Sequence, residues 1–155
     1  MGPSTVDDIV LFIAKMASGA VATFEASRLS TGCKNANRLE IHGEKGAIRF
    51  NFERMNELDW YDATLPAELQ GWNTINVTDG NANHPYAASW WPAAHILGYE
   101  HSFINQAADM LTVIGGGEPV VPLADFADAY EVQKVLSAVV ESDKQRSPVP
   151  LDQIQ

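Results

Sequence analysis

The chain has 155 residues, of which 46% are hydrophobic and 19% are charged, and this composition is typical of a single folded domain covering residues 1–155. Its net charge of −10 argues against nucleic-acid binding, because the ten Lys and Arg residues are scattered and form no basic stripe. The longest apolar run, Ile9–Ala14, is too short to cross a bilayer, so we predict a cytoplasmic protein without a membrane segment. The single cysteine, Cys33, excludes an internal disulfide.

The first half of the chain alternates strand patterns with turns. Val6–Met16 is apolar without regular alternation, so both faces of this strand should be covered. A turn at Ala17–Gly19 leads into a second strand, Ala20–Ser27, and the two form a predicted hairpin. Further strands are expected at Arg38–His42, Ala47–Phe52, Leu58–Tyr61 and Thr74–Val77. The connections between neighbours are too short for crossover helices, so the sheet should be largely antiparallel.

The segment Asp79–His95 combines residues that break regular structure with large aromatic side chains. Tyr86, Trp90 and Trp91 are too apolar for a loop that is merely solvated, so this segment must pack against something. Indole and phenol faces also stack on sugar C–H surfaces, while nearby His and Asn side chains can bond hydroxyl groups. The residues alone favour a structural or subunit-contact role over sugar binding, and both interpretations stay open.

Two helices are predicted in the second half. The first begins at Tyr99 and is stopped by Gly115–Gly117, and the second is N-capped by Asp125 and ends at Ser147-Pro148. Their apolar stripes consist of Phe103, Ala107, Met110, Leu111 and Ile114 in the first helix and Val132, Val135, Leu136, Val139 and Val140 in the second. Strands followed by helices predict an α+β fold, an open and largely antiparallel sheet with the two C-terminal helices packed on one face.

Two helices cover only one face of such a sheet, whereas the first strand is apolar on both. We therefore expect the other face to be available for subunit contact, which makes the protein a homo-oligomer, or to meet a further domain. The alternative is that Asp79–His95 folds over the open face.

Motifs for metal, nucleophile or cofactor chemistry are weak. His95 and His101 are six residues apart and lie on different faces of a helix; a loop could gather them with His84 and Glu100, but nothing in the spacing requires it, and no metal is predicted. There is no G-x-S-x-G elbow for a nucleophile. Gly115–Gly117 follows a helix and not a strand, so it is a helix stop and no cofactor-binding residue is predicted.

The order and spacing of four segments nonetheless resemble the C-terminal domain of the Gfo/Idh/MocA oxidoreductases, the group of glucose-fructose oxidoreductase and inositol dehydrogenase. The segments cover nearly the whole chain: VDDIVLFIAKMASGAVATFEASR, NRLEIHGEKGAIRFNFERMNELDWYD, HPYAASWWPAAHILGYEHSFINQAADML and GGGEPVVPLADFADAYEVQKVLSAVVESDKQRSPVPL. The resemblance implies an open antiparallel sheet with helices on one face and a second subunit on the other.

The resemblance also indicates which parts of the family's chemistry to expect here. Family enzymes carry an N-terminal Rossmann domain that binds NAD or NADP and a catalytic lysine in a Glu-Lys-Pro motif, and neither is found in this sequence; Glu44-Lys45-Gly46 corresponds to a hairpin turn. The family's Asp-x-x-x-His pair is also absent. We therefore expect a substrate-side and oligomerisation domain of an NAD(P)-dependent sugar or cyclitol dehydrogenase, one that binds no cofactor and is not catalytic by itself.

Five residues are candidates for contact with a small sugar-like substrate, by their place in the matching segments: Arg28, Tyr86, Trp90, Trp91 and His95. No catalytic residue is predicted. Two alternatives remain: a stand-alone, non-enzymatic subunit that binds carbohydrate or caps a partner, and a metal-dependent enzyme using the loop histidines.

Overall fold

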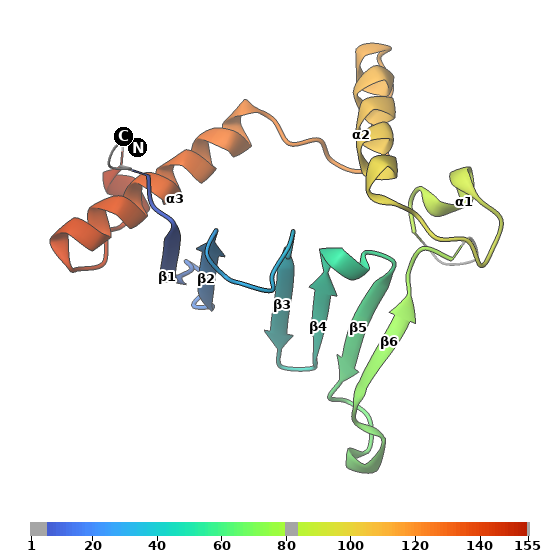
Figure 1. Ribbon diagram of the computed structural model, residues 1–155, viewed down its shortest axis with the longest axis horizontal. Helices are drawn as coiled ribbons and strands as arrows, with labels where there is room; N and C mark the ends of the chain where they lie inside the picture. The colour runs from blue at the N-terminus through green and yellow to red at the C-terminus, as the bar shows by residue number, and fades with distance from the viewer. Residues whose placement is uncertain (1–5, 80–83, 155) are drawn as a thin grey trace. The chain divides into compact units, whose positions relative to one another are not determined.

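The structure is a computed structural model that describes residues 6–79 and 84–154. The chain divides into two compact units: Met1–Cys33 together with Ala124–Gln155, and Lys34–Leu123. The strands are β1 (Ile9–Lys15), β2 (Val21–Ser27), β3 (Arg38–Gly43), β4 (Gly46–Asn51), β5 (Glu57–Asp62) and β6 (Trp72–Asn76) (Figure 1). The α-helices are α1 (Ala87–Trp90), α2 (Tyr99–Ile114) and α3 (Phe126–Gln145), and short 3-10 turns η1, η2 and η3 cover Phe52–Arg54, Ala67–Leu69 and Leu151–Gln153.

The first unit contains the β1–β2 hairpin, which has the predicted antiparallel pairing. On one face Phe12 pairs with Phe24, and their rings stack with centroids 4.6 Å apart. On the other face Ile9, Leu11 and Ile13 are 54%, 71% and 73% exposed. Both faces of β1 are thus apolar, as the sequence predicts, and one of them is left open in the described structure.

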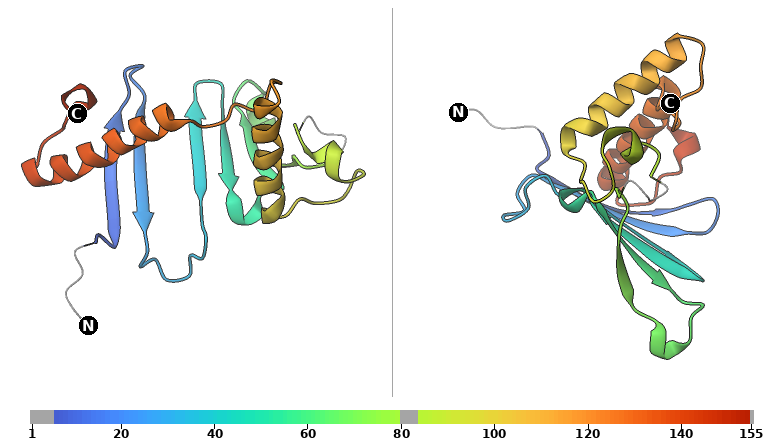
Figure 2. Two further views of the ribbon diagram at one scale, coloured as in Figure 1. Left: turned by 90° about the horizontal axis from the view of Figure 1, so that it is seen from above. Right: turned by 90° about the vertical axis from the view of Figure 1, so that its right-hand side faces the viewer.

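Helix α3 belongs to the same unit and runs crosswise to β1 and β2 (Figure 2). It begins as predicted: the Asp125 carboxylate accepts hydrogen bonds from the backbone N–H groups of Ala127 and Asp128, at 2.7 and 3.0 Å. Such an N-cap satisfies donors that have no partner within the helix. The helix ends at Arg146, which takes a left-handed conformation with φ of 54°.

The second unit is built on an antiparallel meander in the order β3–β4–β5–β6. Its register gathers apolar side chains on one face: Leu39, Ile41, Ile48, Phe50, Leu58, Trp60 and Ile75. The opposite face carries charged pairs, including Arg49 with Glu40 at 3.0 Å, and the Arg49 guanidinium also lies 3.7 Å from the centroid of the Trp72 ring. The sheet therefore has one apolar and one polar face, the usual pattern of an antiparallel sheet.

The turn between β3 and β4 depends on a close approach of backbone atoms. A Cβ added at Gly46 would lie 2.5 Å from the carbonyl oxygen of Tyr61, whereas one added at Gly43 would meet its nearest neighbour at 3.5 Å. Only the second separation is an ordinary van der Waals contact. Gly46 is therefore required where β4 begins against β5.

The antiparallel α+β fold with C-terminal helices is confirmed, with two refinements. The described strands form two sheets, β1–β2 and β3–β6, where one sheet is expected from the sequence. The predicted apolar stripe of α2 is exposed in the described structure: Phe103 is 55%, Met110 51% and Ile114 78% exposed. The inward row of this helix is polar instead, and it shapes the candidate site.

Candidate functional site

The aromatic segment, residues 84–98, is fastened to α2 by a row of polar side chains. His101, Asn105 and Asp109 are spaced four residues apart and therefore share one face of the helix. Each of the three accepts a hydrogen bond from the aromatic segment. A single face of α2 thus fixes this segment at three points.

The deepest of these contacts joins Tyr86 to Asp109. Asp109 is only 2% exposed, and its carboxylate accepts hydrogen bonds from the Tyr86 hydroxyl and from the backbone N–H of Val120, the latter at 3.0 Å. The hydrogen bond from Tyr86 and those from the backbone keep the pKa of Asp109 below its usual value. Burial, together with the hydrogen bond to Asp109 and its charge, raises the pKa of Tyr86 to about 12. Asp109 is therefore a buried carboxylate that links the aromatic segment to Val120, in the connection that follows α2.

Trp90 is held by the next residue of the row. Its indole Nε1–H donates to Oδ1 of Asn105 at 2.7 Å, and its ring lies edge-on to the His101 ring at 4.4 Å between centroids. His101 in turn accepts the backbone N–H of Gly98 on Nδ1 at 3.0 Å. Because Nδ1 acts as an acceptor, the proton of a neutral His101 sits on Nε2.

The Trp91–Ile96 turn presents exposed side chains. Trp91 is 45% exposed, and its ring stacks with that of His95 at 6.2 Å and an angle of 26°. Nδ1 of His95 lies 3.1 Å from the carbonyl oxygen of Pro92 and 3.2 Å from that of Ala93. Both partners are acceptors, so Nδ1 carries the proton, and Nε2 of the neutral ring is left as an acceptor.

Side chains from the sheet region fix the middle of this turn and the residue that follows it. Ala94 has a φ of 69° and donates its N–H to Asp79 at 3.1 Å. Asn56 accepts the N–H of Leu97 at 2.8 Å and donates to its carbonyl oxygen at 2.9 Å. A left-handed conformation costs an L-residue about 1–2 kcal/mol, and the surrounding hydrogen bonds maintain it.

His84 starts the aromatic segment and contributes to its order. Its Nδ1 accepts hydrogen bonds from the backbone N–H groups of Tyr86 and Ala87, both at 3.2 Å. Burial lowers the pKa of His84, because the charged ring would lose its hydration. The neutral ring is the form that can cap the start of α1.

Four of the five predicted candidates lie in this one segment: Tyr86 and Trp90 as half-buried anchors, Trp91 and His95 as exposed groups. Arg28 belongs to the other unit, where it is exposed after β2 and its backbone N–H donates to Asp8 at 2.9 Å. Three residues that hold this segment were not predicted from the sequence: Asn105 and Asp109, which bond Trp90 and Tyr86, and Asn56, which bonds the backbone of Leu97. The signal that could have found Asn105 and Asp109 is the four-residue spacing that they share with His101, which places three polar side chains on one face of α2.

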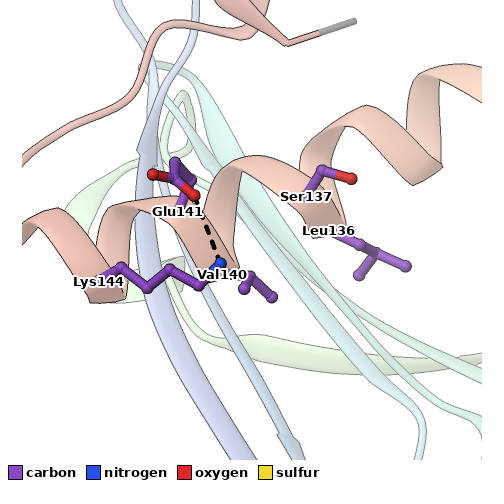
Figure 3. Close-up of a pocket in the computed structure, with 5 residues that line it drawn as sticks. All are labelled: Leu136, Ser137, Val140, Glu141 and Lys144. Carbon is purple, nitrogen blue, oxygen red and sulfur yellow. Dashed lines mark ion pairs between the residues drawn. The ribbon is translucent and has the colours of Figure 1, made fainter.

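The rest of the described structure offers no comparable chemistry. A shallow hollow on α3 is lined by Leu136, Ser137, Val140, Glu141 and Lys144, all from one helix, with an ion pair of 3.6 Å between Glu141 and Lys144 (Figure 3). In the part of the chain that the structure describes, no three His, Cys, Asp or Glu side chains are grouped to hold a metal ion. Within the same residues, no helix is long and apolar enough to cross a membrane.

Fold and site together define an α+β domain that displays aromatic residues on a segment fixed by buried and half-buried polar side chains. Comparison with known proteins then indicates a family. Residues 1–49 match the family model of the GFO/IDH/MocA C-terminal domain. The levoglucosan dehydrogenase of Pseudarthrobacter phenanthrenivorans is 39% identical over 154 residues, which are 99% of this chain and 38% of that protein. The family model and these relatives thus make the chain similar to the C-terminal domain of the GFO/IDH/MocA oxidoreductases.

Solved structures agree with this assignment. An oxidoreductase domain protein from Kribbella flavida superposes with a TM-score of 0.85 at 48% identity, covering 94% of this chain and 38% of that one. Levoglucosan dehydrogenase in complex with NADH and levoglucosan superposes with a TM-score of 0.83 at 37% identity, covering 94% of this chain and 39% of that one. The chain thus spans less than two fifths of the length of these relatives.

Proposed function

We propose that this chain is the substrate-side and oligomerisation domain of an NAD(P)-dependent dehydrogenase that oxidises a sugar or a cyclitol. The observation that carries the proposal is the 39% identity to levoglucosan dehydrogenase over nearly the entire chain. A relative of the same fold has been solved with NADH and a sugar together, which supports this substrate class and this cofactor for the full-length enzyme.

The aromatic segment supports a substrate-side role. Stacking of a sugar ring requires an accessible aromatic face, and hydroxyl recognition requires a polar group held beside it. Trp91 and His95 provide these two groups on a turn whose backbone is hydrogen-bonded at Ala94 and at the following Leu97. Tyr86 and Trp90, which precede this turn in the chain, are hydrogen-bonded to α2. Arg28 remains a candidate for substrate contact only because of its place in the segments that resemble the family.

Within residues 6–79 and 84–154, the structure offers no phosphate cradle for a dinucleotide. A phosphate cradle needs a glycine-rich turn between a strand and a helix, whereas Gly115 and Gly116 follow α2, and Gly116 takes a φ of 84° as a helix stop. We infer that the nicotinamide is held by another part of the full-length enzyme, and no step of hydride transfer is assigned to this chain.

The subunit contact is proposed for the open face of the β1–β2 hairpin. Ile9, Leu11 and Ile13 point to one side of β1 and are each more than half exposed, and Val21 on β2 is 68% exposed on the same face. A continuous row of β-branched and leucine side chains in water is unfavourable by about 25 cal/mol per Å² of apolar surface. A second copy of the chain would cover it.

Expression of the complete gene product, followed by assay for NADH or NADPH formation, tests the proposal. We expect reduction of NAD⁺ or NADP⁺ with levoglucosan, with a pyranose or with a cyclitol, and no reduction by residues 1–155 alone. Activity should persist after treatment with a chelator, which separates this function from a metal enzyme built on the loop histidines. Failure of the full-length protein to oxidise any of these compounds would contradict the proposed function.

A further inference from the structure

The Trp91–Ile96 turn combines features that a surface loop does not need for its own folding. Its side chains at positions 91, 95 and 96 are exposed, with Ile96 at 68%, while its backbone is fixed through Asp79 and Asn56. A loop that served only as a connection would be expected to point its large apolar side chains inward. In this turn the backbone is held by hydrogen bonds, whereas the side chains of Trp91 and His95 are accessible.

The orientation of His95 is also fixed. Its Nδ1–H is directed at two carbonyl oxygens of its own turn, those of Pro92 and Ala93. The ring cannot rotate freely without losing these hydrogen bonds, and its Nε2 lone pair is therefore held at a defined place beside the Trp91 ring. Ala94, between the two carbonyls and the imidazole, keeps the left-handed conformation that this arrangement requires.

We propose that His95 is a specificity-determining residue: its Nε2 accepts a hydrogen bond from one hydroxyl group of a polyhydroxylated ring, while the Trp91 indole lies against the C–H face of that ring. The inference rests on the proposed function and adds to it the atom that selects the substrate. It predicts a preference for rings that carry a hydroxyl beside an apolar face, and discrimination against the matching deoxy compound.

His95→Asn and Trp91→Ala in the full-length enzyme test this assignment, with Ile96→Ala as the matched control from the same turn. Asparagine keeps a donor close to the position of Nδ1 and removes Nε2, so the turn should be retained. In His95→Asn we expect the KM for the sugar to rise about tenfold, the usual effect of losing one hydrogen bond. In Trp91→Ala the KM for the sugar should also rise, because the indole that lies against the ring is removed. The KM for NAD⁺ or NADP⁺ and the melting temperature should stay unchanged, and Ile96→Ala should behave as the unsubstituted enzyme.

A series of monodeoxy sugars gives a second measurement that does not depend on the stability of the variants. One deoxy position should cost the unsubstituted enzyme about tenfold in kcat/KM and cost His95→Asn nothing further, because the hydrogen bond is already absent. Equal sugar KM values in His95→Asn and the unsubstituted enzyme, or equal losses for every deoxy sugar in both, would overturn the assignment. That result differs from failure of the proposed function, in which the unsubstituted enzyme oxidises no sugar at all.

Discussion

The aromatic segment and the β1–β2 hairpin are stabilised in opposite ways. Residues 84–98 are held by polar side chains, Asn56, Asn105 and Asp109, each bonded to a specific atom of the segment. The hairpin is held by its ladder and one stacked pair, and its outer apolar face has no cover in the described structure. Directional bonds fix individual side chains, whereas apolar area only requires that something cover it. This difference is the physical basis for proposing that the first region contacts a small molecule and that the second meets another subunit.

The largest expected effect tests the hairpin. Leu11→Asp places a charge in the middle of the open face, where Leu11 is 71% exposed. Desolvating an unpaired carboxylate in an interface is strongly unfavourable, so we expect the assembly to dissociate and the molar mass from light scattering to fall to that of the monomer. Leu69→Asp, at a position 62% exposed in the other unit, should leave the mass unchanged. A monomeric unsubstituted protein at micromolar concentration would contradict the subunit contact.

The next largest effect tests the polar anchoring. Asp109→Ala removes the acceptor of the Tyr86 hydroxyl and of the Val120 N–H. Buried donors without acceptors are costly, and we expect the melting temperature to fall by about 4 °C or more, measured by tryptophan fluorescence. Asp109→Asn keeps one acceptor and should lose less. An unchanged melting temperature in Asp109→Ala would show that the hydrogen bonds to Asp109 do not hold this segment.

Alkaline pH offers a smaller test of the same anchoring. The pKa of Tyr86 is raised from 10.0 to about 12 in the folded state, so the folded protein retains the phenol proton more strongly than the unfolded chain. The resulting stability is complete below pH 10 and is lost as the pH rises toward 12. Tyr86→Phe should show a smaller alkaline loss of stability in urea unfolding, while Tyr130→Phe, at a tyrosine that is 54% exposed, should not. Identical pH profiles for Tyr86→Phe and the unsubstituted protein would exclude a buried Tyr86 phenol.

The smallest effect concerns the turn that carries His95. Ala94→Gly relieves the left-handed conformation but increases the freedom of the unfolded chain, so the free energy of unfolding should rise by no more than about 1 kcal/mol. Ala93→Gly, at a neighbouring position without positive φ, should lower it by a similar amount. Equal effects of the two glycines would show that Ala94 is not strained.

Local signals in the sequence were sufficient for several elements. Helix α2 has its predicted bounds because glycines flank it at positions 98 and 115, and α3 begins where Asp125 can cap it. The hairpin turn ending at Gly46 was also predicted correctly. Helix α1 was missed because four residues are too few to show a helical period, and its start relies on the His84 ring.

The candidate site was only partly predictable for a different reason. The aromatic residues are conspicuous by composition, but the residues that hold their segment are distant in the chain: Asn56 precedes Leu97 by 41 residues and Asp109 follows Tyr86 by 23. No periodicity relates such positions. The inward row of α2 is polar because each of its members accepts a hydrogen bond from the aromatic segment, a partner that lies elsewhere in the sequence.

The close approach at Gly46 predicts how the chain tolerates sequence change. The backbone of Tyr61 occupies the space that any side chain at position 46 would need, and a backbone carbonyl cannot move aside as a flexible side chain can. In a saturation library selected for folded protein, position 46 should retain glycine alone. Position 43, the other end of the same turn, should accept alanine, so two glycines that look equivalent in the sequence would separate into one fixed and one replaceable position.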